Sequence, residues 1–177
     1  MRFGSTVFVF ALASALVGCV KPDQMDKTTK SNTVGPGAAY VDTAFAATLF
    51  KNVCVATRPS FERGRKNISK AGFAKHDRKS DIYYDRRFDL SFKIGKLDGG
   101  VTRGCSMVFA SREKAQVLAF FFGSVVADMT TRKPEIFISD NRRNSQVDLP
   151  HGQSFWLLEL GKENGRKYYQ AVIAGQY

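Results

Sequence analysis

The chain has 177 residues, of which 44% are hydrophobic and 12% aromatic, so the composition excludes a disordered protein and suffices for one domain with a hydrophobic core. Its 27 lysines and arginines against 16 aspartates and glutamates give a net charge of +11. Such an excess argues against a strongly basic partner and favours an anionic one.

The first nineteen residues have the order of an export signal. Arg2 supplies a positive start, residues 7–17 are an unbroken run of apolar and small side chains, and charged side chains resume at Lys21. The run is shorter than the roughly 20 apolar residues of a membrane-spanning helix. It therefore predicts a leader that is removed from the mature protein.

The end of this leader, Leu16-Val17-Gly18-Cys19, resembles the lipobox of bacterial lipoproteins. The resemblance implies a signal peptide over residues 1–18 and a mature chain that begins at Cys19. The thiol of Cys19 would carry a diacylglyceryl group, and its amine would carry a fatty acyl chain such as palmitate. Because Val20 stands where inner-membrane lipoproteins often have Asp, the resemblance favours the periplasmic leaflet of a Gram-negative outer membrane over the inner membrane. The alternative is general signal-peptidase cleavage near Ala13-Ser14-Ala15, with Cys19 unmodified.

The chain has three cysteines, and lipidation of Cys19 would leave Cys54 and Cys105. In an oxidising compartment these two are expected to form a disulfide. The closed loop of roughly 50 residues corresponds to an entropic stabilisation of about 4 kcal/mol. Two buried free thiols, or one nucleophilic cysteine, are the alternatives, although neither residue lies in a catalytic signature.

Residues 19–40 are predicted to be the lipidated cysteine and a flexible tether, because they hold many Thr, Ser and Asn residues and the turn-forming Gly35-Pro36-Gly37. A flexible chain of about 20 residues spans roughly 25 Å. The remainder, residues 41–177, is predicted to be a single globular domain.

This domain opens with two predicted helices. Phe45, Leu49 and Val53 recur at helical spacing after a cap at Asp42 or Thr43, and Pro59 ends the pattern near residue 57. A second, strongly basic helix is predicted over residues 60–71, with Ser60 as its cap.

Strands follow. Residues 88–94 alternate apolar and polar side chains, which indicates a strand with one buried face. A shorter strand at 82–85 precedes it, and the turn residues Asp98-Gly99-Gly100 predict a hairpin with a strand over 101–109.

A long apolar helix is predicted next over residues 111–131, with Ser111 as its cap and Phe120-Phe121-Phe122 packed on the sheet. A strand at 136–139, a polar loop over 140–153 and a hairpin around Asn164-Gly165 complete the chain. This order predicts an α+β fold with an antiparallel sheet of about five or six strands, three helices packed on it and one disulfide.

The clearest candidate for a binding surface is a basic segment between residues 58 and 79, where only Glu62 and Asp77 oppose the positive charges. Its members are Arg58, Arg63, Arg65, Lys66, Lys70, Lys75, Arg78 and Lys79. An anionic lipid, a phosphorylated glycolipid, a cell-wall polymer or an acidic envelope protein would suit this face, and a solvated, solubilising face is the alternative. The export signal argues against nucleic acid as the partner.

Residues for an enzyme are sparse. The two histidines, His76 and His151, lie outside any metal-binding spacing. A hydrolase or transferase acting on cell-wall or glycan substrates would need His151 as its acid or base, with Ser145 or Ser154 nearby. No cofactor and no metal are predicted.

A third possibility is a lipid or small-ligand carrier that uses the Phe-rich helix. The segment Gly104-Cys105-Ser106-Met107-Val108-Phe109 is similar to segments of uncharacterised small envelope proteins of Gram-negative bacteria, a resemblance that carries no activity. The favoured interpretation is a non-enzymatic, membrane-anchored envelope lipoprotein that binds an anionic surface or an envelope protein through its basic segment.

Overall fold

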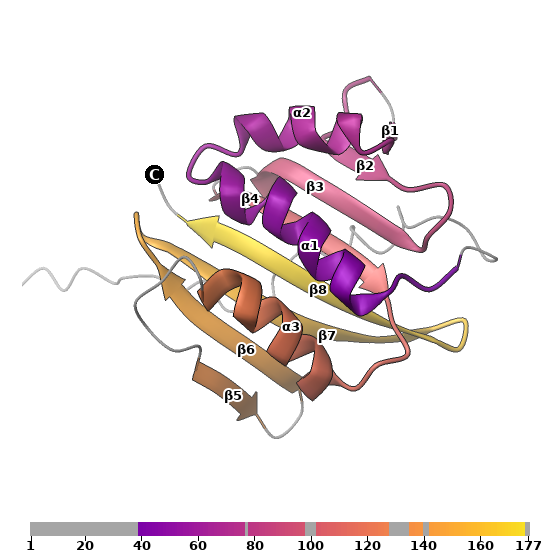
Figure 1. Ribbon diagram of the computed structural model, residues 1–177, viewed down its shortest axis with the longest axis vertical. Coiled ribbons are helices and arrows are strands. Elements are labelled where there is room, and N and C mark those ends of the chain that lie inside the picture. The colour runs from indigo at the N-terminus through magenta and orange to yellow at the C-terminus, as the bar shows by residue number, and fades with distance from the viewer. Residues whose placement is uncertain (1–38, 77, 98–101, 128–134, 140–141, 176–177) are drawn as a thin grey trace, which may run out of the picture.

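The computed structural model describes residues 39–76, 78–97, 102–127, 135–139 and 142–175. They form an α+β domain in which three α-helices lie on one side of an antiparallel sheet, as Figure 1 shows. The fold class, the three helices and the disulfide are as the sequence predicts. The predicted signal peptide, Cys19 and the Asp98-Gly99-Gly100 turn lie outside the described residues.

Of the two candidate caps of helix α1 (Thr43–Val53), Asp42 is the one used: its Oδ1 accepts from the Phe45 N–H at 2.9 Å. A short 3₁₀ turn, η3 (Val55–Thr57), continues it. Helix α2 (Glu62–Lys70) follows, and helix α3 (Ala115–Ala127) connects the two halves of the sheet. Helix α3 begins four residues after the predicted cap Ser111, whose Oγ accepts from the Glu113 N–H at 3.1 Å ahead of the helix.

The sheet has the order β1-β2-β3-β4-β8-β7-β6-β5, and every neighbouring pair is antiparallel. Each half is a meander, and the last strands of the two meanders pair at the centre of the sheet, where Phe109 lies opposite Tyr169. The strands are β1 (Ala74–Lys75), β2 (Ile82–Tyr84), β3 (Leu90–Leu97), β4 (Thr102–Ala110), β5 (Glu135–Ser139), β6 (Arg142–Leu149), β7 (Gln153–Glu163) and β8 (Arg166–Gly175).

The eight strands correct the expected five or six. Strand β6 occupies most of the segment 140–153, which the sequence predicts as a polar loop, and it pairs with both β5 and β7. Strand β1 is only two residues long and has no sequence signal of its own. The polar composition of β6 therefore reflects a strand held by its backbone neighbours rather than a loop.

Aromatic side chains from the helices and the sheet fill the space between the two layers. Phe50 of α1 packs against Phe122 of α3 and Phe155 of β7, with ring centroids 5.6 and 5.7 Å apart. Phe122 in turn stacks on Phe109 at 5.3 Å. The disulfide between Cys54 and Cys105, whose Cα atoms are 5.5 Å apart, links the end of α1 in the helix layer to β4 in the sheet.

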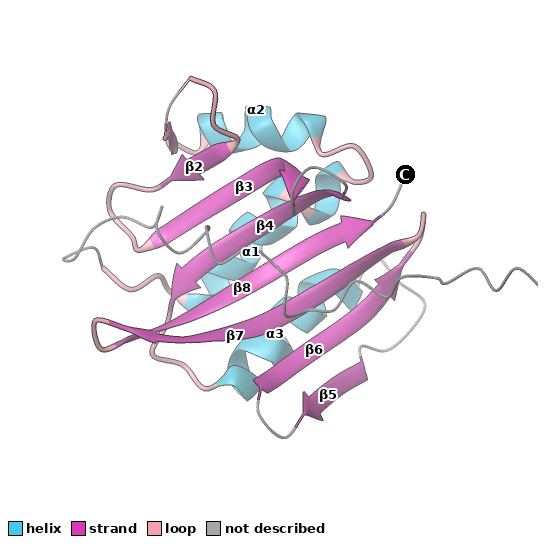
Figure 2. Ribbon diagram, turned by 180° about the vertical axis from the view of Figure 1, so that it is seen from behind, coloured by secondary structure: helices cyan, strands magenta, loops and turns pink. Residues whose placement is uncertain are grey.

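The other face of the sheet carries no helix among the described residues (Figure 2). Two small apolar clusters lie there, one around Val172 and one around Val108. Between them Gln170 Nε2 donates to Ser106 Oγ at 2.8 Å. Tyr40, assigned by the sequence to the tether, packs against the second cluster, and the guanidinium groups of Arg112 and Arg166 lie 4.6 and 4.8 Å from its ring centroid. Tyr40 thus packs on the domain, one residue before the predicted start at residue 41.

Candidate functional site

The basic segment is presented mainly by helix α2, which lies at the top of Figure 1 above the β2–β3 end of the sheet. Gly64 and Ile68 are buried and fix the inner side of the helix. Ser60 was predicted to cap this helix, but Phe61 occupies the cap position with φ 60°, and the Phe61 side chain is buried in the core. The burial of Phe61 and Ile68 sets the rotation of α2, so the basic side chains take the outer side.

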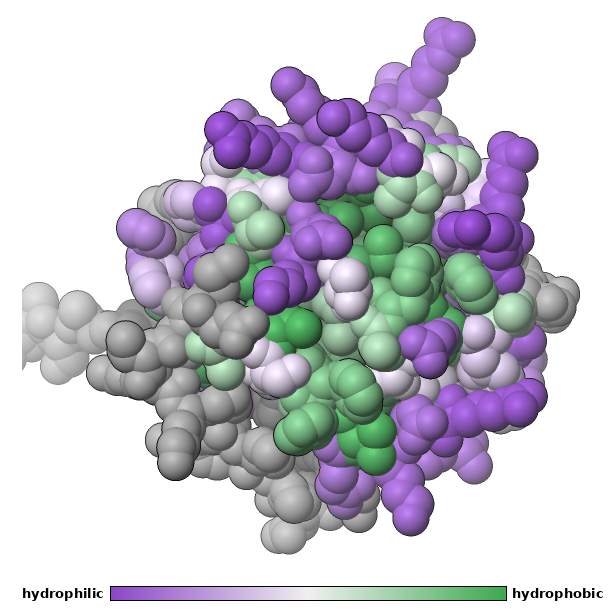
Figure 3. Space-filling view, viewed as in Figure 1, coloured by the Kyte–Doolittle hydropathy of each residue, from purple (hydrophilic) through white to green (hydrophobic). Residues whose placement is uncertain are grey.

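Three of the basic residues form one line on that outer side, and we call Arg63, Lys66 and Lys70 the basic stripe. They are exposed and follow each other at spacings of three and four, which places them on one side of a helix. Glu62 is the one acid of α2. In Figure 3 the surface over α2 is correspondingly hydrophilic.

Arg65 and Arg58 point elsewhere. Arg65 Nη2 lies 3.3 Å from Asp81 Oδ1 and donates to the Ile94 carbonyl at 3.2 Å, so this guanidinium joins α2 to the sheet. Arg58 is half-buried, and its Nε donates to the Val55 carbonyl at 3.2 Å. Both residues have structural roles and contribute less to an outward anion-binding surface than the sequence predicts.

The remaining basic residues lie in and after β1, beside the end of α2 that carries Lys70 (Figure 1). Lys75, Arg78 and Lys79 are exposed, and Lys75 Nζ donates to the Arg78 carbonyl at 3.0 Å. These three positive charges extend the basic stripe towards the β1–β2 connection.

The residues considered for catalysis are not brought together. His151 occupies an exposed turn with φ 66°, and Ser154 donates its hydroxyl proton to Asp148 Oδ1 at 3.0 Å instead. His76 is exposed beside the basic residues of the β1–β2 connection. Among the residues that the structure describes, no group of three His, Cys, Asp or Glu side chains has a metal-binding arrangement.

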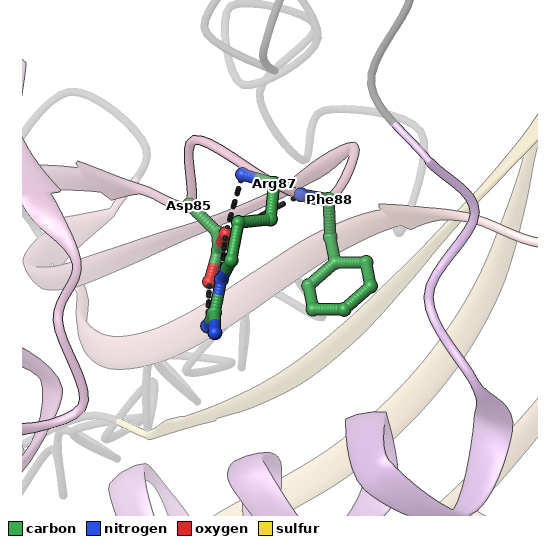
Figure 4. A network of polar contacts seen from close by, with 3 residues as sticks. All are labelled: Asp85, Arg87 and Phe88. Atoms are coloured by element: carbon green, nitrogen blue, oxygen red, sulfur yellow. Dashed lines mark hydrogen bonds and ion pairs between the residues drawn. The ribbon is translucent and has the colours of Figure 1, made fainter.

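Two buried carboxylates that were not among the predicted site residues lie in the β2–β3 connection. Asp85 accepts from the Arg87 side chain at 2.9 Å and from the backbone N–H groups of Arg87 and Phe88, as Figure 4 shows. Burial alone raises the pKa of Asp85, but the hydrogen bonds and positive charge of Arg87 and the Phe88 N–H outweigh it, so the pKa lies below its usual value. The same carboxylate raises the pKa of Arg87.

The second carboxylate, Asp89, is buried beside the first. Its Oδ2 accepts from Tyr168 Oη at 2.7 Å and from Arg166 Nη1 at 3.1 Å, which ties the connection to β8. The sequence signal for both acids is the pattern Asp-Arg-Arg-Phe-Asp over residues 85–89, an acid on each side of a basic pair in a turn. The chain's own donors hold both oxygens of Asp85 and Oδ2 of Asp89, so these bonds stabilise the turn.

The three consecutive phenylalanines of α3 have three different environments. Phe122 is fully buried in the core, Phe121 is half-buried and Phe120 is 70% exposed. Core packing therefore accounts for Phe122 but not for Phe120.

No helix within the described ranges is both long and apolar enough to cross a membrane. Comparison of the chain with protein-family models, with curated proteins and with solved structures finds no match.

Proposed function

We propose that this chain is a membrane-anchored envelope lipoprotein that binds an anionic surface through the basic stripe, as a binding protein rather than an enzyme. The observation that carries the proposal is the stripe itself, in which Arg63, Lys66 and Lys70 stand exposed on one side of α2 with the side chains of Lys75, Arg78 and Lys79 beyond its end. The lipobox-like segment supports the anchor, and the pairing of Cys54 with Cys105 leaves Cys19 as the third cysteine of the chain.

Anionic lipid headgroups are the partner that an anchored domain meets first. Each lysine or arginine near an anionic membrane contributes about 1 kcal/mol to binding. A surface with several such residues and few acids gains most from headgroups at low ionic strength, because salt shortens the range of the attraction to about 10 Å at 0.1 M. An acidic envelope protein is the competing partner for the same stripe.

The test compares residues 20–177 with and without the stripe. In the variant Arg63→Glu, Lys66→Glu and Lys70→Glu, we expect co-sedimentation with phosphatidylglycerol vesicles to weaken by about 100-fold or more at low salt. The matched control reverses three exposed basic residues outside α2 and outside the β1–β2 connection, Lys96, Arg103 and Lys162, which gives the same change in net charge.

Equal loss in the two variants would mean that total charge, not the stripe, drives binding. Undiminished binding of the α2 variant at low salt would end the proposal. Mass measurement of the protein isolated from its own cells tests the anchor separately: an uncut leader or an unmodified thiol at Cys19 contradicts it.

A further inference from the structure

The outer surface of α1 and α3 is apolar, whereas the exposed side of a helix in a water-soluble domain usually carries charged residues. Phe120 is 70% exposed and Phe45 is 39% exposed. Helix α3 has no charged residue between Ala115 and Ala127. Single exposed apolar side chains are common on proteins, but here they group on two helices that lie side by side (Figure 1).

We call this group the helix-face patch. It comprises Phe45, Phe88, Phe120, Phe121 and Val125. Phe45 and Phe88 are in ring contact at 5.8 Å, while Phe88, Phe121 and Val125 pack partly against the core beneath them. In Figure 3 apolar colour accordingly runs across the middle of the face that α1 and α3 cover.

Positive charges border the patch. The Arg87 guanidinium lies 5.3 Å from the Phe88 ring centroid, and its side chain is 66% exposed. Lys114 is exposed just before α3, and the basic stripe of α2 lies on the same side of the sheet (Figure 1). Among the side chains that the structure describes, the exposed acids on this side are fewer: Asp42, which caps α1, Glu62 and Glu113.

An apolar centre with a basic border is the arrangement that interfacial membrane proteins use. Apolar side chains enter the boundary between headgroups and acyl chains, and lysines and arginines bind the anionic headgroups. An acidic protein would satisfy the border, and aromatic side chains are also common at the centre of protein interfaces, but a lipid surface is the partner beside which the proposed anchor holds this domain. A second copy of this chain would bring two sets of positive charges together.

We propose that the whole helix face, α1 and α3 as well as α2, lies flat on an anionic lipid bilayer, with Phe120 inserted below the headgroups. The inference rests on the proposed function and adds the orientation of the domain and the residue that enters the membrane. The helix-free face of the sheet then points away from the bilayer.

The chain's single tryptophan makes this orientation measurable. Trp156 lies half-buried on the helix-free face, next to Val172. The variant Phe120→Trp with Trp156→Phe moves the one indole to the helix face. Both the native protein and this variant are purified as full chains from their membrane and reconstituted into vesicles that contain brominated phosphatidylcholine, with or without phosphatidylglycerol.

With phosphatidylglycerol present, we expect the indole introduced by Phe120→Trp to be quenched by the brominated chains and its emission to shift to the blue. Trp156 of the native protein should show neither change. Separately, Phe120→Ser should weaken the salt-sensitive binding of residues 20–177 about tenfold or more, whereas Ser124→Ala, one turn along the same exposed side of α3, should leave it unchanged.

Absence of quenching at position 120 in the anionic vesicles, or equal quenching of Trp156, overturns the orientation. If binding still depends on Arg63, Lys66 and Lys70 in that case, the proposed function stands and only the orientation fails. If quenching at position 120 persists after those three charges are reversed, the patch binds lipid without the stripe, and the role proposed for the stripe fails instead. Concentration-dependent dimerisation that Phe120→Ser abolishes, without quenching, would assign the patch to a second copy.

Discussion

At the scale of single residues, the β2–β3 connection is stabilised by buried carboxylates that accept hydrogen bonds from neighbouring residues of the chain. The Asp85 carboxylate accepts hydrogen bonds from four donors: the backbone N–H, Nε and Nη2 of Arg87 and the backbone N–H of Phe88. A carboxylate taken out of water is tolerated only when donors of this kind replace the lost solvation. The ionised form of Asp85 is thus part of the folded state, and the stability of the domain depends on it.

Replacement of Asp85 by Asn should therefore lower the free energy of unfolding at pH 7 by about 1.5–3 kcal/mol, because hydrogen bonds to a charged acceptor are lost. The pKa of Asp85 is lowered in the folded protein, so its contribution is complete above the unfolded value near 3.9 and is lost as pH falls through the folded value. Urea unfolding at several pH values should show the gap between wild type and variant constant from pH 7 to 5 and closing below about pH 4.

Asp81→Asn is the matched control for this prediction. Asp81 pairs with Arg65, but the two side chains are 38% and 48% exposed, so the change should cost less than about 1 kcal/mol. A gap for Asp85→Asn that stays the same at pH 3 would show that the carboxylate charge is not what stabilises the turn.

At the scale of elements, α2 is held against the rest of the helix layer by a close backbone approach. A Cβ atom placed on Gly64 would lie 2.5 Å from the Val53 carbonyl oxygen and 3.0 Å from Thr57 Oγ1. Thr57 Oγ1 also donates to the same carbonyl at 2.6 Å. Since the obstacle is backbone at the end of α1, a larger residue at position 64 must push the two helices apart.

Gly64→Ala should consequently destabilise the domain by about 1–3 kcal/mol, although alanine favours an isolated helix over glycine by about 1 kcal/mol. Chemical denaturation measures the loss, and the α2 surface should become more accessible to proteases. Ser69→Ala, at an exposed position of the same helix, is the control and should change stability by less than about 0.5 kcal/mol. A Gly64→Ala protein more stable than wild type would contradict the close approach.

Periodicity and turn residues predicted most elements and the two hairpins β3–β4 and β7–β8, but not the other strand pairings. Helix α1 and the β7–β8 hairpin follow from spacing and turn residues, and the register Glu163↔Arg166 places Asn164-Gly165 in the turn as expected. Strand β6 was missed because its alternation appears only at its end, where Val147 and Leu149 are buried and Asp148 is exposed. Strand β6 is held by backbone hydrogen bonds to β5 and β7, and the pattern of its side chains does not predict those bonds.

Helix α3 starts later than its sequence suggests because the residues predicted to form its first turn make hydrogen bonds to strand β8 instead. The Ser111 N–H donates to the Lys167 carbonyl at 3.1 Å, and Tyr169 Oη donates to the Glu113 carbonyl at 3.1 Å. These bonds hold the segment before α3 on strand β8. A capping residue with an acid two positions later is therefore a signal that long-range contacts can override.

The sequence predicted which basic residues make up the candidate site, but it predicted only part of their arrangement in space. The spacing of Arg63, Lys66 and Lys70 marks one side of a helix, but the attachment of Arg65 to Asp81 depends on where β2 lies. The exposure of Phe120 had no sequence signal, because three consecutive phenylalanines are equally consistent with full burial. The helix-face patch thus became visible only with the packing of α1 beside α3.

At the scale of the whole molecule, two four-stranded meanders meet through β4 and β8 and share one layer of helices. The disulfide crosses this arrangement near its centre: Cys54 follows α1, Cys105 lies in β4, and both are fully buried. It closes a loop of 51 positions that contains α2 and the first three strands. The cross-link therefore restricts the half of the unfolded chain that carries the basic stripe.

Removing this cross-link with Cys54→Ala and Cys105→Ala together should lower the free energy of unfolding by about 2–5 kcal/mol, mainly because the unfolded chain gains freedom. Both cysteines must change, since a single replacement leaves a thiol available for other reactions. Denaturation with and without a reductant provides the control: wild type should lose stability when reduced, to about the level of the double variant, and the double variant should not respond. Equal stability of oxidised wild type and double variant would mean that the packing around Phe50 and Met107 holds the two layers together without the bond.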